Sequence, residues 1–178
     1  MTQIRRDNAQ QNNWKLALVL LSVLLSCSGK SGNESAHEQI AVSETQKVKL
    51  KDLNGQPIDL SQYKGKTIFI NFWATWCKPC VQEMTTINNA QSLLKNEDVV
   101  FLFASNEEID QIKKFSKKHS YNFSYVKLEN MEELKIQALP TTFIFDSEGK
   151  LKFSETGFRM WDEPANINLI TKIKNHEK

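Results

Sequence analysis

The stretch NFWATWCKPC, residues 71–80, carries most of the information in this chain of 178 residues. Its two cysteines are separated by two residues, and they lie between an apolar run at 67–73 and an amphipathic pattern that begins near Pro79. Pro79 suits the first turn of a helix, where its missing N–H costs no hydrogen bond and its fixed φ matches the helical backbone. We therefore predict two thiols at the N-terminus of a helix that directly follows a buried strand.

This position favours ionisation of Cys77. Free backbone N–H groups and the helix dipole place about +0.5 of an elementary charge at a helix N-terminus, and Lys78 adds a cation beside it. Such surroundings favour the thiolate, which is the attacking species in thiol chemistry. We predict that Cys77 is the nucleophile, that Cys80 is the resolving thiol, and that the two form a redox-active disulfide.

Three other uses of the cysteine pair are weaker on the residues alone. A zinc site needs two more ligands, and His37, His119 and His176 show no ligand-pair spacing. Covalent haem attachment needs a histidine directly after the second cysteine, where Val81 stands. A purely structural disulfide would leave the aromatic lead-in and the helix-start proline unexplained. We expect no metal and no other cofactor.

The N-terminal residues are typical of an export signal. Two arginines and a lysine within residues 1–15 precede about ten apolar positions at 16–25, about half of the roughly 20 that cross a bilayer. The run ends in LLSC at 24–27, which resembles a bacterial lipoprotein signal with Cys27 as the lipidated first residue of the mature chain. An uncleaved anchor and an ordinary signal with an unrelated cysteine are the alternatives.

We accordingly predict a lipoprotein signal peptide at 1–26, a flexible tether at 27–46 and a folded domain at 47–176. The tether begins with small polar residues and has a typical reach of roughly 25 Å as a random coil. In the lipoproteins that this leader resembles, a serine at the second mature position, here Ser28, favours the outer membrane over the inner membrane. We therefore expect a membrane-anchored protein on the periplasmic side.

The charge of the chain excludes one class of partner. The whole chain has 23 basic and 21 acidic residues, and removal of residues 1–26 would leave equal numbers of both. The lysine pairs at 113–114 and 117–118 are typical of a solvated helix face. A nucleic-acid-binding domain usually carries a basic surplus or stripe, so we expect no nucleic acid partner.

The apolar periodicity predicts an α/β fold. Runs that alternate or are continuously apolar indicate strands, and apolar residues spaced by three and four indicate helices. Strands are expected at 47–53, 58–60, 67–73, 99–104, 123–128, 141–145 and 150–156, and helices at 79–95, 108–119, 131–137 and 162–174. This order predicts a central mixed β-sheet flanked by helices.

Residues 71–80 resemble the active-site segment of the thioredoxin superfamily, and more narrowly that of its membrane-tethered TlpA/ResA branch. The resemblance covers about 48–174. Residues 53–66 resemble the N-terminal β-hairpin extension of that branch, and Leu139-Pro140 followed by a threonine resembles its cis-proline loop. It implies a thioredoxin-like fold with a cis peptide bond before Pro140. It also implies that the backbone at Leu139 and Pro140 faces a substrate next to Cys77. Trp73, Trp76 and Phe158 are further candidates for the substrate surface, and of these we expect Trp73 to be buried and Trp76 to be partly exposed.

The resemblance also assigns a role to Glu83. Thioredoxin has a buried aspartate where this chain has Asn71, and an asparagine cannot serve as a base near pH 7. The TlpA/ResA branch instead has a glutamate three residues after its second cysteine, which Glu83 matches. Residues i and i+3 share a helix face, so a desolvated Glu83 would take the proton of Cys80 as a catalytic residue. The alternative is an exposed helix glutamate with no chemical role.

The implied function is that of an extracytoplasmic thiol-disulfide oxidoreductase. The branch reduces disulfides of exported proteins and receives electrons from a membrane thiol reductant, and apocytochrome c is one candidate client. A disulfide oxidase or isomerase of the same fold and a non-catalytic lipoprotein binding module are the alternatives. A peroxide-reducing enzyme would need a lone cysteine beside a threonine and an arginine, and Arg159 is about 80 residues away in the sequence.

Overall fold

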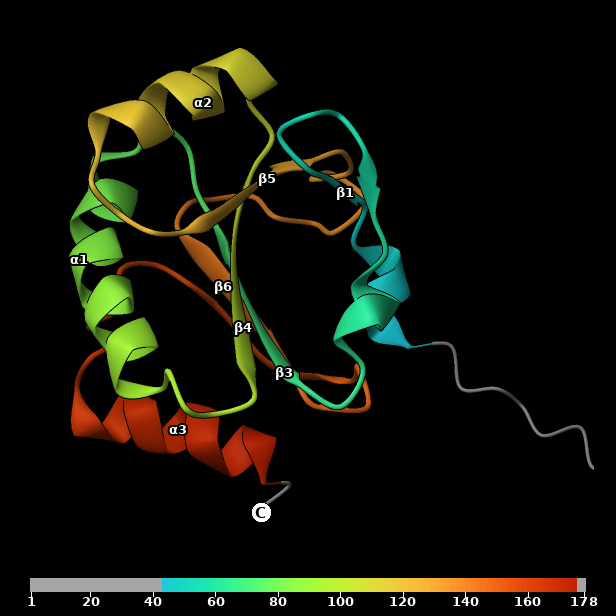
Figure 1. Ribbon diagram of the computed structural model, residues 1–178, viewed down its shortest axis with the longest axis vertical. Helices are drawn as coiled ribbons and strands as arrows, with labels where there is room; N and C mark the ends of the chain where they lie inside the picture. The colour runs from blue at the N-terminus through green and yellow to red at the C-terminus, as the bar shows by residue number, and fades with distance from the viewer. Residues whose placement is uncertain (1–42, 176–178) are drawn as a thin grey trace, which may run out of the picture. The chain divides into compact units, whose positions relative to one another are not determined.

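The computed structural model describes residues 43–175, which contain one seven-stranded sheet with the strand order β2-β1-β5-β4-β3-β6-β7. Figure 1 shows how the helices surround this sheet. The elements are η1 (Glu44–Lys47), β1 (Leu50–Lys51), β2 (Pro57–Ile58), η2 (Leu60–Tyr63), β3 (Thr67–Phe72), α1 (Lys78–Leu93), β4 (Val99–Ser105), α2 (Ile109–Lys118), β5 (Ser124–Leu128), β6 (Thr141–Phe145), β7 (Leu151–Thr156) and α3 (Pro164–Lys174).

β3 is an interior strand, which pairs parallel with β4 on one edge and antiparallel with β6 on the other. β4 pairs parallel with β5, and β6 pairs antiparallel with β7. The sheet is therefore mixed, and the predicted α/β thioredoxin-like class is confirmed. In this register, Asn71 of β3 lies directly opposite Thr142 of β6, so the two side chains project from the same face of the sheet.

Both faces of the sheet are covered, because successive strand residues point to opposite sides. Phe69 and Trp73 pack in a cluster with buried residues of α1, α2 and α3. Ile68 and Ile70 pack in a second cluster with Leu60 of η2 and with residues of the outer strands. Figure 1 shows α1 and α3 on one side of the sheet and the two 3-10 helices on the other. Asn71 has the parity of Phe69 and thus points toward α1.

The predicted helix at 131–137 is wrong. Residues 131–135 form successive turns, and Lys135 adopts a left-handed conformation with φ of 56°. That conformation ends any helical run and directs Ile136, which is 8% exposed, into the second apolar cluster. The apolar positions of this segment therefore report a buried loop rather than an amphipathic helix.

The described structure begins at Ser43, inside the range expected for the tether. Thr45 of η1 is buried, and its backbone N donates to the carbonyl of Gly149 at 3.3 Å. The Ser43 hydroxyl donates to the same carbonyl at 3.1 Å. The predicted signal peptide, Cys27 and the rest of the tether up to residue 42 lie outside the described residues. Among residues 43–175, no helix combines the length and the apolar character that crossing a bilayer requires.

Candidate active site

Cys77 and Cys80 form a disulfide at the start of α1, with 5.3 Å between their Cα atoms. Cys77 is the N-cap of the helix, and its Sγ accepts a hydrogen bond from the backbone N of Cys80 at 3.3 Å. The helix begins at Lys78, with Pro79 in its first turn. The Cys77 sulfur therefore lies where the helix dipole and a backbone donor both favour negative charge.

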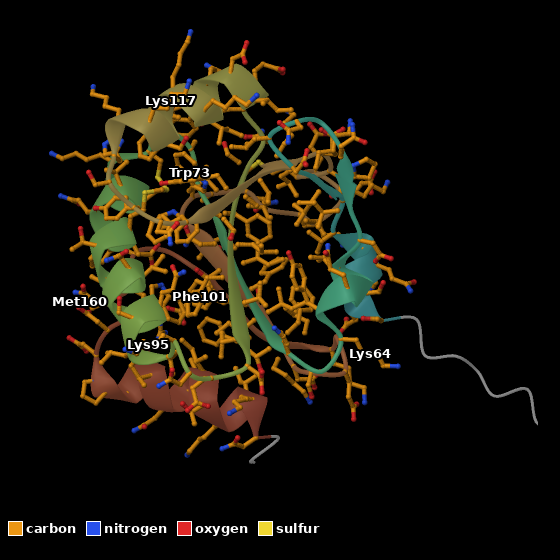
Figure 2. All side chains as sticks on the ribbon, viewed as in Figure 1. Lys64, Trp73, Lys95, Phe101, Lys117 and Met160 are labelled. Atoms are coloured by element: carbon orange, nitrogen blue, oxygen red, sulfur yellow. A yellow bond between two sulfur atoms is a disulfide. The ribbon has the colours of Figure 1, made fainter. Side chains whose placement is uncertain are left out.

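The two tryptophans before the disulfide have different environments, as expected. Trp73 is 1% exposed and packs against the rings of Phe115 and Tyr125, with centroid distances of 4.6 and 5.6 Å. Figure 2 shows Trp73 in the interior of the domain. Trp76 is 75% exposed, so a large apolar ring stands in solvent directly before Cys77. An exposed aromatic ring at this position is available to a partner.

Glu107 fixes the loop that leads into the disulfide, a role that the sequence analysis does not predict. Its carboxylate accepts from the backbone N of Thr75 at 2.7 Å and from the Thr75 hydroxyl at 2.6 Å. The hydroxyl of Ser105, at the end of β4, donates to the same carboxylate at 3.1 Å. One signal in the sequence was available. Glu107 follows the end of β4, and because β4 runs parallel to β3, the carboxyl ends of the two strands meet at one edge of the sheet.

Glu83 lies one turn after Cys80 in α1, and both side chains have no exposed surface. Its Oε1 accepts hydrogen bonds from the indole N–H of Trp161 at 2.8 Å and from the backbone N of Arg159 at 3.0 Å. Its Oε2 accepts from Nδ2 of Asn71 at 3.1 Å. The carboxyl group is thus removed from water and surrounded by three N–H donors.

Burial raises the pKa of Glu83 from 4.5 to about 7, because desolvation of the charged form outweighs the hydrogen bonds. The bonds from Trp161, Arg159 and Asn71 and the positive charge of Arg159 lower the pKa, but by less. A carboxyl group with a pKa near 7 exchanges protons readily at neutral pH. The alternative of an exposed helix glutamate at this position is wrong.

The loop between β7 and α3 supplies two of the three donors. Thr86 anchors this loop to α1, since its hydroxyl accepts from the backbone N of Trp161 at 3.1 Å and contacts the carbonyl of Arg159 at 3.3 Å. The Arg159 guanidinium lies over the Trp161 ring at 5.5 Å and forms an ion pair with Glu155. The contribution of Trp161 was missed, because nothing in the sequence links it to Glu83, 78 residues away.

The peptide bond between Leu139 and Pro140 is cis, as the resemblance implies. Pro140 is buried, and its carbonyl accepts from the backbone N of Gly157 at 2.8 Å. Leu139 is half-buried and packs against the apolar cluster that contains both cysteines. Phe158 follows Gly157 in the chain and is 48% exposed. The residue that hydrogen-bonds to the proline loop is therefore followed directly by an exposed apolar ring of the β7–α3 connection.

The described residues 43–175 contain no group of three or more His, Cys, Asp or Glu side chains that would hold a metal ion. The functional groups gathered at this end of the sheet are the disulfide, the buried carboxyl group and their hydrogen-bond partners. These groups suit thiol chemistry with proton transfer.

Comparison with known proteins agrees with this geometry. The sequence pattern of the AhpC/TSA family matches residues 43–154. The chain is 32% identical over 141 residues to the thiol-disulfide oxidoreductase ResA of Bacillus cereus, covering 76% of this chain and 82% of that protein. It is 34% identical over 131 residues to ResA of Bacillus subtilis, covering 71% and 72%.

A solved structure has the same fold. The exposed lipoprotein thioredoxin of Streptococcus pneumoniae superposes with a TM-score of 0.58 at 24% identity, covering 70% of this chain and 97% of that one. This structural similarity supports the fold alone, whereas the two sequence relatives support thiol-disulfide chemistry.

Proposed function

This chain belongs to the AhpC/TSA family and to the ResA group of thiol-disulfide oxidoreductases of the thioredoxin superfamily, and on that basis we propose that it reduces disulfides of exported proteins. The single observation that carries the proposal is the Cys77–Cys80 disulfide at the N-terminus of α1, one turn from a fully buried Glu83. This arrangement supplies a nucleophile, a resolving thiol and a base on one helix.

In the proposed reaction, the Cys77 thiolate attacks one sulfur of the client disulfide, and the other client sulfur leaves as a thiolate. Glu83 takes the proton of Cys80, and the Cys80 sulfur then attacks the Cys77 sulfur of the mixed disulfide. The second client sulfur leaves, and the proton on Glu83 is released to it or to water. The client gains two electrons, and the enzyme ends as the Cys77–Cys80 disulfide.

Two properties of the site support these roles. The helix N-terminus stabilises negative charge on the Cys77 sulfur through the dipole and the Cys80 backbone N–H. The raised pKa of Glu83 lets the carboxyl group accept and release a proton within the neutral range. Cys80 has no exposed surface, so the client reaches Cys77 first.

We assign the client-binding surface to Trp76, Leu139, Pro140 and Phe158. The exposed rings of Trp76 and Phe158 offer apolar contact to an unfolded or extended client. The backbone at Leu139 precedes β6 and offers main-chain pairing to an extended segment. This mode of binding selects for accessible disulfides in extended chains rather than for one client sequence.

We place the protein outside the cytoplasm, anchored through a lipid on Cys27. The leader at 1–26 and the polar residues that follow Cys27 support this assignment, and a solved relative of the same fold is named a lipoprotein thioredoxin. Ser28 favours the outer membrane on the periplasmic side. A membrane thiol reductant would return two electrons per cycle, and apocytochrome c awaiting haem is a candidate client.

Two alternatives can be weighed against the site. Peroxide reduction needs a free cysteine beside an arginine guanidinium, but Cys77 is bonded to Cys80, and the Arg159 guanidinium contacts Glu155 and Asn166. A disulfide oxidase or isomerase would use the same residues in another direction. The reduction potential separates these possibilities, because about 30 mV changes the equilibrium tenfold.

Trapping tests the proposal. Cys80→Ala keeps the nucleophile but removes the resolving thiol, so we expect mixed disulfides with exported proteins to accumulate on Cys77. Cys77→Ala is the matched control and should trap far less. A binding module without catalysis would give no disulfide-linked clients in either variant, and that result would contradict the proposal.

A further inference from the structure

One polar atom beside Glu83 has no hydrogen-bond partner among the described residues 43–175. It is Oδ1 of Asn71, a residue with no exposed surface. Nδ2 of the same amide donates to both Oε2 of Glu83 and Oγ1 of Thr142, each at 3.1 Å. A buried acceptor without a donor costs free energy, so its position next to an acid with a pKa about 7 calls for an explanation.

The two oxygens of Glu83 differ in their partners. Oε1 faces the indole N–H of Trp161 and the backbone N–H of Arg159, and neither group can accept a hydrogen bond. Oε2 faces the side chain of Asn71, which carries both a donor and an acceptor. A proton on Oε1 would face no acceptor, whereas a proton on Oε2 can be accepted by Asn71, provided that the carbonyl of the amide faces it.

We propose that the Asn71 amide is a proton-coupled switch, which rotates by about 180° when Glu83 gains the Cys80 proton on Oε2. In the ionised state, Nδ2 donates to Glu83 and to Thr142, which is the arrangement present here. In the protonated state, Oδ1 accepts from the Glu83 O–H and from the Thr142 hydroxyl, which can both donate and accept. Every hydrogen bond along Glu83, Asn71 and Thr142 reverses direction, while the backbone stays fixed.

The strands hold the switch in register. Asn71 of β3 and Thr142 of β6 are direct cross-strand partners, so their side chains stay adjacent in both states. None of the other groups described around Glu83 hydrogen-bonds to its Oε2.

Trp161 is neutral and donates to Oε1 alone. The charge that acts on Glu83 is that of Arg159, which is itself paired with Glu155. Cys80 lies one turn earlier on the same helix.

The switch makes Asn71 a positioning residue for the Glu83 proton, and this role rests on the proposed function of Glu83. The amide stabilises the carboxylate before Cys80 is deprotonated and stabilises the carboxylic acid afterwards. Each protonation state of Glu83 therefore has a hydrogen-bond partner at Oε2, which lowers the cost of moving a proton into this fully buried site. A leucine at position 71 could serve neither state, because it carries no hydrogen-bonding group.

The chain contains a matched control in Asn130. Nδ2 of Asn130 also donates to a glutamate, Glu133, at 2.9 Å. Its amide cannot turn, because Nδ2 also donates to the carbonyl of Lys47 at 2.8 Å and Oδ1 accepts from the backbone N of Lys49 at 2.9 Å. Rotation would place Oδ1 against two acceptors, the Lys47 carbonyl and the Glu133 carboxylate, and Nδ2 against one donor, the Lys49 N–H.

The test follows side-chain amides by ¹H–¹⁵N NMR on the full disulfide-bonded chain between about pH 5 and pH 9. We expect the chemical shifts of the Asn71 side-chain amide to change with pH at the same midpoint as the chemical shift of the Glu83 carboxyl carbon. Its nuclear Overhauser contacts to Thr142 should be present at high pH and lost at low pH, while those of Asn130 to Glu133 persist. Contacts of Asn71 that stay unchanged while Glu83 titrates would overturn the switch, as would a Glu83 that stays ionised throughout.

Two sets of variants complete the test. Glu83→Gln should hold Asn71 in the turned state at every pH, because the glutamine oxygen takes the two fixed N–H donors and its NH₂ then faces Asn71. Thr142→Val should raise the midpoint of the pH profile of disulfide exchange by about 0.5–1 pH unit. In this variant the ionised state leaves one N–H of Asn71 unpaired, whereas the protonated state leaves the Asn71 carbonyl with one partner, and the unpaired N–H costs more. Thr142→Ser should restore it, and an unshifted profile in Thr142→Val would count against the switch.

Failure of the switch and failure of the function of Glu83 give different results. A titrating Glu83 with a fixed Asn71 overturns the switch and leaves the reductase proposal intact. A normal exchange rate in Glu83→Gln overturns the proton role of Glu83, whatever the Asn71 amide does.

Discussion

Two asparagine–glutamate pairs in this domain have the same chemistry and opposite pKa shifts. Asn71 donates to Glu83, and burial raises the pKa of that carboxyl group to about 7. Asn130 donates to Glu133, whose side chain is 62% exposed, and that bond together with Lys49 lowers the pKa of Glu133. Removal from water, rather than the hydrogen-bond partner, therefore decides whether the pKa of a glutamate here lies near 7 or below its ordinary value.

The largest expected difference between the pairs is in catalysis. Glu83→Gln should slow disulfide exchange about 10²- to 10⁴-fold near pH 8, where the wild-type carboxyl group is ionised and can take the Cys80 proton. Glu133→Gln should keep the wild-type rate. Stopped-flow oxidation of the reduced protein by a disulfide peptide measures both, and equal rates in the two variants would remove the distinction.

The next effect concerns stability as a function of pH. The pKa of Glu83 is about 7 in the folded state, above the ordinary value of 4.5 that applies to the unfolded chain. Between about pH 4.5 and 7 the folded protein therefore binds one proton more than the unfolded chain. The stability that this contributes is complete below pH 4.5 and is lost as the pH rises through about 7, by about 3 kcal/mol relative to Glu83→Gln. Urea unfolding of both proteins across this range measures it.

The exposed pair should behave in the opposite sense. The lowered pKa of Glu133 means that its contribution is present at neutral pH and is lost as the pH falls through its folded-state pKa. Lys49→Met should return the carboxyl group toward its ordinary value, because it removes the ammonium at 3.0 Å. A wild-type stability that rises steadily between pH 4.5 and 7 relative to Glu83→Gln would contradict the account of Glu83.

A smaller effect is expected when one donor to Glu83 is removed. Trp161→Phe keeps an aromatic ring in the core but deletes the N–H that meets Oε1 at 2.8 Å. Loss of a hydrogen bond to a carboxylate should raise the pKa of Glu83 above about 7 by about 1–2 units. The exchange-rate profile should move to higher pH by the same amount, and a shift to lower pH would show that the indole stabilises the acid instead.

The smallest effect is expected at Glu107, whose side chain holds the active-site loop through Thr75. Glu107→Gln keeps the shape but weakens the charge-assisted bonds to Thr75. We expect a loss of about 1 kcal/mol in unfolding free energy, with an unchanged pH profile of exchange. A shifted pH profile would show that Glu107 also acts on the thiol chemistry.

The sequence predicted the parts of the site that depend on local spacing. Cys77 and Cys80 were placed at a helix start by Pro79 and the apolar run before them, and the structure has them there. Glu83 was placed on the Cys80 face by its spacing of three residues. These relations lie within one strand–helix unit, where the backbone geometry fixes which side chains meet.

The long-range partners of that site could not be predicted. Trp161 and Arg159 meet Glu83 only because the β7–α3 loop docks on Thr86 of α1. The segment at 131–135 failed for a related reason, because its apolar residues fit both a helix and a buried loop, and packing of Ile136 selects the loop. Local periodicity carries no information about such docking.

The central claim is that the start of α1 holds one ionised sulfur, Cys77, and one protonated resolving thiol, Cys80. Its most direct test is alkylation of the fully reduced protein at mildly acidic pH, followed by mass spectrometry. The account predicts that Cys77 reacts rapidly at about pH 6 while buried Cys80 stays unmodified. Equal and slow reaction of both cysteines, or faster reaction of Cys80, would contradict it.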